Sequence, residues 1–134
     1  MSALPAWSLE AVDLLFFVLH AVLILFNLTG WIWNRTRHAH LLCVLTTLFS
    51  WFVMGAFHGV GYCLCTDWHF QVRRRLGLPI FGHSFLQLAA QVWFGVNLSQ
   101  TASDLLAGGG LLLIVAGMII VRVRQRLHQT PRGP

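Results

Sequence analysis

The chain has 134 residues, of which 57% are hydrophobic and only 10% are charged, and its formal net charge is +5. Soluble domains carry about a quarter charged residues, so this composition excludes an ordinary water-soluble protein and favours one surrounded by a lipid bilayer. All nine basic residues are arginines that lie at the ends of apolar segments, and this placement is typical of membrane-flanking charge and argues against nucleic-acid binding.

The first half of the chain predicts a helical hairpin. An apolar segment at about 9–33 exceeds the roughly 20 residues that span a hydrocarbon core, and Trp7 and Trp33 bracket it as aromatic belt residues do. A second segment, about 40–62, contains no Arg, Lys, Asp or Glu. Because the link between the two segments is short, we expect the helices to be antiparallel neighbours.

A polar stretch follows the second segment and predicts an interfacial helix at about 66–77. Thr66 and Asp67 suit its start, and large apolar residues alternate with basic ones along it. Three consecutive arginines, Arg73, Arg74 and Arg75, are expected to bind anionic lipid headgroups.

Two more helices are expected, at about 80–97 and 104–122. The segment 80–97 is polar for a membrane span, whereas 104–122 is an uncharged run between Asp104 and Arg122 that is rich in glycine. The predicted fold is therefore an all-α integral-membrane four-helix bundle, with one transmembrane domain over 1–127 and a polar tail at 128–134. A bundle of this kind is also expected to pack against partner membrane subunits.

Topology follows from the number of crossings. Four crossings place both termini on the side that carries seven arginines, against two (Arg35 and Arg37) on the other side. The positive-inside rule then makes both termini cytoplasmic. If the segment 80–97 does not cross, the C-terminal arginines join Arg35 and Arg37, and the preferred orientation reverses.

Polar side chains recur on one face of each helix. In the first segment, Asp13 and His20 are seven residues apart and share a stripe with Asn27. Polar groups that face lipid are costly, so we expect these stripes to face one another. Candidate catalytic or proton-transferring residues are then Asp13, His20, His58, Asp67 and His69, and candidate cofactor ligands are His20, His58 and His83.

Several interpretations of these polar residues remain open. The leading interpretation is a structural or accessory membrane subunit, in which these residues form interhelical hydrogen bonds that fix helix register. The alternatives are an electron-transfer subunit, in which they are axial ligands of haem or another tetrapyrrole, and a proton-coupled membrane enzyme, in which they form acid/base pairs. No metal site is predicted, because Cys63 and Cys65 lack the usual C-x-x-C spacing. Whether the protein is an enzyme stays open at this stage.

Two runs carry a family resemblance. One extends from Phe26 to Trp33 (FNLTGWIW), and the other extends from Gly59 to His69 (GVGYCLCTDWH). They resemble small bacterial inner-membrane proteins grouped as domain of unknown function 2784, which have a Cys-x-x-Thr motif after the second helix, here Cys63 to Thr66. The resemblance implies a multi-pass protein of the bacterial inner membrane and implies no activity. Cys65 departs from the family pattern and is not assigned as a zinc ligand.

Overall fold

The structure is a computed structural model that describes residues 5–59 and 61–129. These residues are 79% helical and include no strand, which confirms the predicted all-α class. The last helix continues through Gln129, so residues 130–134 of the polar tail expected at 128–134 lie outside the described residues.

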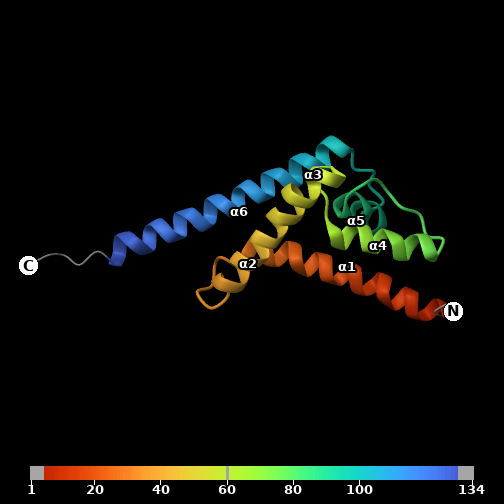
Figure 1. The fold of residues 1–134 in the computed structure, drawn as a ribbon, viewed down its shortest axis with the longest axis horizontal. Coiled ribbons are helices and arrows are strands. Elements are labelled where there is room, and N and C mark those ends of the chain that lie inside the picture. The colour runs from red at the N-terminus through yellow and green to blue at the C-terminus, as the bar shows by residue number, and fades with distance from the viewer. Residues whose placement is uncertain (1–4, 60, 130–134) are drawn as a thin grey trace, which may run out of the picture.

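Five helical bodies make up the described fold (Figure 1). The chain begins with α1 (Ala6–Thr29) and then turns back into a continuous helix at Arg37–His58. This second body consists of α2 (Arg37–Leu48), the π-helical segment η1 (Phe49–Met54) and α3 (Gly55–His58). The remaining bodies are α4 (Leu64–Arg75), α5 (Phe85–Phe94) and α6 (Gln100–Gln129).

Three helices among the described residues are long and apolar enough to cross a membrane: Trp7–Thr29, Arg37–His58 and Gln100–His128. At about 1.5 Å of rise per residue, each exceeds the ~30 Å of a hydrocarbon core. Little of their apolar surface is buried inside the protein, and large side chains such as Leu14, Phe52 and Leu112 are exposed. That exposure fits surroundings of lipid.

The expected third membrane helix, 80–97, is shorter than predicted. Only Phe85–Phe94 is helical, and ten residues rise about 15 Å, half the thickness of the hydrocarbon core. Two polar residues of this segment, Ser84 and Gln87, form a capping box at the helix start, and Gly95 ends the helix in the left-handed conformation (φ 66°). The four-helix bundle is therefore approximate, with three long helices and the short α5.

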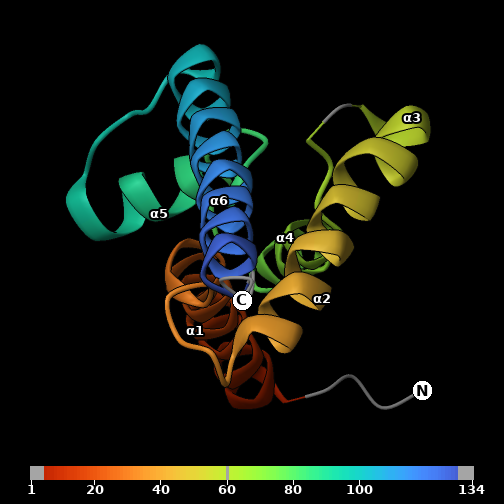
Figure 2. The ribbon, with the colours of Figure 1, turned by 90° about the vertical axis from the view of Figure 1, so that its left-hand side faces the viewer.

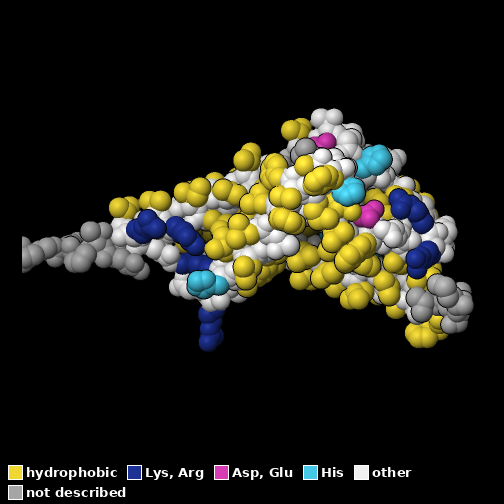
Figure 3. All heavy atoms as spheres, in the orientation of Figure 1, with side chains coloured by type: hydrophobic (Ala, Val, Ile, Leu, Met, Phe, Trp, Pro, Cys, Tyr) yellow, Lys and Arg dark blue, Asp and Glu magenta, His cyan; other side chains and the backbone are white. Residues whose placement is uncertain are grey.

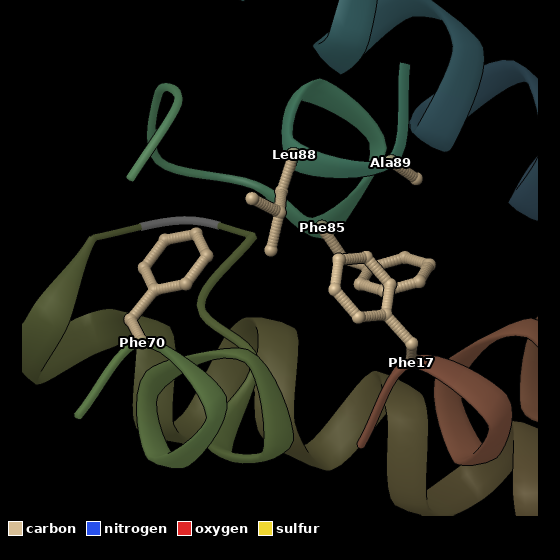
Figure 4. Close-up of a cluster of buried hydrophobic side chains, with 5 residues drawn as sticks. All are labelled: Phe17, Phe70, Phe85, Leu88 and Ala89. Atoms are coloured by element: carbon tan, nitrogen blue, oxygen red, sulfur yellow. The ribbon is translucent and has the colours of Figure 1, made fainter. Parts of the chain in front are cut away.

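The short helix that we expected at 66–77 is close to its predicted position. It begins after Cys63 and ends at Arg75, rather than covering 66–77, and it packs along the first half of α1. Between α1, α4 and α5 lies a compact apolar core (Figure 4), whose buried members are Phe17, Phe70, Phe85, Leu88 and Ala89. Thus α4 and α5 fold onto α1 as one packed unit.

At the opposite end, a tight turn joins α1 to α2. A Cβ at Gly30 would lie 2.7 Å from the Phe26 carbonyl oxygen and 2.8 Å from the His40 ring. His40 is buried there, and its Nε2 lies 2.7 Å from the Asn27 carbonyl oxygen. Figure 2 shows that α2 and α6 come together near this end of the molecule and diverge toward the other end.

Candidate functional site

Two polar helix faces meet between α1 and α4. Asp13 and His20 are seven residues apart on α1, and Thr66, His69 and Arg73 follow one another on α4 at spacings of three and four. The two helices are antiparallel, so Asp13 meets His69 and Arg73 while His20 meets Thr66. The predicted stripe on α1 thus faces polar partners, which come chiefly from α4 rather than from the second long helix, Arg37–His58.

Asp13 is the centre of a buried ionic cluster. His69 Nε2 donates to Asp13 Oδ1 at 2.8 Å, and Arg73 Nη1 lies 3.2 Å from both carboxylate oxygens. Arg73 also donates from Nε and Nη2 to the Pro79 carbonyl oxygen, at 3.3 and 3.1 Å. Arg73 therefore links α1 and α4 to the segment that leads into α5.

Aromatic rings enclose the histidine of this cluster. His69 is fully buried: it stacks on Phe16 at 5.4 Å between ring centroids and meets Phe17 edge-on at 4.7 Å. The guanidinium of Arg73 lies 5.6 Å from the Phe17 ring centre, at cation–π distance. Burial lowers the pKa of His69 below its usual value, and the hydrogen bond to Asp13 opposes that shift.

A second histidine extends the cluster toward the middle of α1. His20 is 6% exposed and stacks on Phe85 at 4.3 Å. Its Nε2 lies 3.2 Å from Thr66 Oγ1 and 3.5 Å from Cys63 Sγ. Among the described residues, Nδ1 of His20 and Nδ1 of His69 are buried without a hydrogen-bond partner.

The other sequence-predicted site residues lie outside this cluster. His58 is exposed at the end of α3 and stacks on Tyr62 at 4.6 Å. Asp67 lies in the first turn of α4 and accepts a hydrogen bond from Gln71 at 2.9 Å. His83 is exposed before α5, and its backbone N–H donates to Gln87 Oε1. The structure thus brings together Asp13, His20 and His69 and leaves these three candidates apart.

Potential metal ligands do not gather at one place among the residues that the structure describes. Within the described part of the chain, no group of three or more His, Cys, Asp or Glu side chains could hold a metal ion. Cys43, Cys63 and Cys65 are free thiols. What the cluster can do chemically is hold an ion pair and accept or donate protons at its two imidazoles.

Two members of the cluster were not among the site residues predicted from the sequence. Arg73 was expected at lipid headgroups, yet it is 5% exposed, while Arg74 and Arg75 are exposed. Thr66 was expected to begin the helix, yet the helix begins after Cys63 and the Thr66 hydroxyl meets His20. The usable signal was the spacing of Thr66, His69 and Arg73, which puts three polar residues on one helix face.

Comparison with known proteins places the chain in a family. A family model described as a protein of unknown function, DUF2784, matches residues 10–123. This match covers most of the chain, so the protein belongs to that family, in agreement with the resemblance seen in its sequence. Searches among curated proteins and among solved structures gave no match.

Proposed function

We propose that this protein is a non-catalytic subunit of a membrane complex. The observation that carries the proposal is that the side chains of the polar cluster bond one another. Both carboxylate oxygens of Asp13 are within hydrogen-bond distance of Arg73, His69 occupies one of them as well, and phenylalanine rings surround the histidine. A general base must reach a substrate proton directly or through one water, whereas this carboxylate is engaged in holding α4 against α1.

The outer surface supports the same role. Along α6, an added Cβ at Gly108, Gly109 or Gly110 would meet nothing within 4 Å. Large apolar side chains flank these glycines and are exposed, among them Leu105, Leu106, Leu112 and Leu113. Small residues between large ones let a second helix approach closely in a bilayer, so α6 offers a face for a partner subunit.

The arrangement of the helices supports one orientation in a bacterial inner membrane. Three crossings place the ends of the chain on opposite sides, in contrast to the predicted four crossings with both termini cytoplasmic. The side that holds the end of α6 and the start of α2 carries five described arginines, against three on the side of α4. The positive-inside rule then favours a cytoplasmic end of α6, and Arg74 and Arg75 face the headgroups of the opposite leaflet.

Two measurements test the proposed role. Purified full-length protein is expected to be colourless between 380 and 700 nm, whereas a Soret band would favour the tetrapyrrole interpretation. In the second measurement, leucines replace the α6 glycines in a Gly108→Leu/Gly109→Leu variant, and the subunit is expected to leave its native complex on blue-native gels. Gly108→Ala/Gly109→Ala, which keeps both side chains small, is the matched control. Retention of the complex by the leucine variant contradicts the proposed α6 interface.

A proton-coupled role is the second candidate, and one observation favours it. His20 and His69 lie in the same cluster, and each leaves its Nδ1 buried without a partner among the described residues. Proteoliposomes loaded with a pH-sensitive dye and given a potassium-valinomycin potential test this role. A proton flux above that of empty liposomes, and its loss in His20→Phe, would replace the subunit proposal. We expect no such flux.

A further inference from the structure

One end of the molecule is basic and contains no side-chain carboxylate. The four acidic residues of the chain are Glu10, Asp13, Asp67 and Asp104, and they lie in the first half of α1, in α4 and at the start of α6. The opposite end holds Arg35, Arg37, Arg122, Arg124 and Arg126. Figure 3 shows basic side chains at both ends of a hydrophobic body, with the visible acidic side chains near one end only.

Two adjoining cavities lie at this basic end, between α2 and α6. The larger has a volume of about 380 Å³ and is lined by Arg37, Val121, Arg124, Gln125 and His128. The smaller, more enclosed cavity of about 30 Å³ shares Arg37 and Val121 with it and adds mainly apolar groups. These further lining residues are Trp31, His40, Leu41, Met118 and Arg122.

Helix periodicity explains why these residues share one wall. Val121, Arg124, Gln125 and His128 follow one another on α6 at spacings of three, one and three, so they lie on one face. On the other wall, Arg37 is held in place because its Nε donates to the Trp31 carbonyl oxygen at 3.3 Å. Two helices thus present guanidinium groups to one open cavity with an apolar floor.

We propose that this basic cavity binds the headgroup of an anionic phospholipid, with Arg37, Arg122 and Arg124 as phosphate ligands. Guanidinium groups bind phosphate oxygens through paired hydrogen bonds. Basic pockets between membrane helices on the cytoplasmic side suit anionic headgroups. The proposal does not rest on the subunit role proposed above.

The apolar floor selects a lipid over a soluble anion. Leu41, Met118 and Val121 continue from the arginines toward the membrane-spanning part of α6, where acyl chains would lie beside them. An inorganic phosphate would use only the arginines and leave this floor empty. Three guanidinium groups also exceed the charge of one phosphodiester, so a headgroup with two phosphates is expected to bind more tightly than a headgroup with one.

Native mass spectrometry of the full chain in detergent tests the proposal directly. The probes are cardiolipin, phosphatidylglycerol and phosphatidylcholine at equal concentrations, and we expect retention to fall in that order. The Arg37→Gln/Arg124→Gln variant should lose cardiolipin affinity by roughly thirtyfold, from the contribution of each arginine near an anionic headgroup. The matched control is Arg35→Gln/Arg126→Gln at the same basic end, because neither arginine lines the two cavities. This variant should change cardiolipin affinity less than about threefold.

Three outcomes would overturn the proposal. One is equal retention of phosphatidylcholine and cardiolipin, and another is a larger loss of cardiolipin in the control variant than in the cavity variant. The third is displacement of the lipid by millimolar inorganic phosphate, which would make the cavity a soluble-anion site. If Arg37→Gln/Arg124→Gln does not fold, the single exposed Arg124→Gln replaces it, with an expected loss of roughly fivefold. Arg124→Lys should keep most of the affinity.

Discussion

Replacement of Asp13 by asparagine should lower the free energy of unfolding by about 3 kcal/mol. Asparagine keeps the shape of the side chain and one acceptor oxygen, so the hydrogen bond from His69 at 2.8 Å can persist. The charge of Arg73, which is only 5% exposed, loses its carboxylate partner. Removal of one partner from a buried ion pair costs about 3–5 kcal/mol, and the 15% exposure of the Asp13 side chain places this pair near the lower limit.

Unfolding in mixed micelles, with SDS titrated against a mild detergent and tryptophan fluorescence as readout, measures this change. A loss of about 3 kcal/mol is a shift of roughly a hundredfold in the unfolding equilibrium. Asp104→Asn is the matched control, because Asp104 is exposed and bonds only to Gln100 among the described residues; its effect should stay within about 0.5 kcal/mol. Adding Arg73→Met to Asp13→Asn should recover part of the loss, because it removes the unpaired charge. An Asp13→Asn protein as stable as the wild type refutes the assigned role of the ion pair.

Three further changes test the packing of α4, α5 and α6. Gly82→Ala should destabilise the protein by about 1–3 kcal/mol, because φ is +73° there and a Cβ would collide with the Gln87 side chain; chemical unfolding measures this loss. Ser103→Ala should cost about 1 kcal/mol, since its buried hydroxyl lies 2.6 Å from Ser84 Oγ, and hydrogen exchange in α5 should rise. Stability should fall as pH drops below the ordinary His69 pKa of 6.5, because burial lowers the folded-state pKa and the unfolded chain therefore binds the proton first.

Controls for these three changes follow from exposure and conformation. Gly108→Ala should not destabilise the protein, because that glycine is helical and open, so equal losses at Gly82 and Gly108 would contradict the capping argument. Ser99→Ala removes an exposed hydroxyl that bonds only to the Ala102 backbone among the described residues, and it should leave exchange in α5 unchanged. His69→Gln should make the stability profile less steep between pH 7 and 5, and an unchanged slope would assign the dependence to other groups.

The sequence was sufficient to predict the long helices because their signal is local. Apolar segments of about 20 residues satisfy nearly all their backbone groups within one helix, and the structure has a long apolar helix at each of the three segments with this pattern. The segment 80–97 failed as a span because helix-start chemistry at Ser84 and Gln87, together with Gly95, confines the helix to ten residues. In that segment, local capping decided the helix length and the apolar residues did not.

The candidate site was harder to predict because it depends on which helices touch. The stripe of Asp13 and His20 could be recognised from a spacing of seven residues, but its partner face could not. We expected the stripes of the membrane helices to face one another, whereas Thr47 of the second body bonds to the Cys43 carbonyl oxygen of its own helix. The partner is α4, a short helix in which apolar and basic residues alternate. Its contact with α1 joins segments that are far apart in the sequence.

The triple arginine illustrates how one sequence feature serves two purposes. Successive residues of an α-helix point about 100° apart, so one helix face cannot bury three consecutive side chains. Arg73 lies four residues after His69, on the face toward α1, and it pairs with Asp13. Arg74 and Arg75 point away from that face and stay exposed. Neutralisation of Arg73 is therefore a stability experiment, whereas neutralisation of the exposed pair Arg74 and Arg75 should leave the ion pair between Arg73 and Asp13 in place.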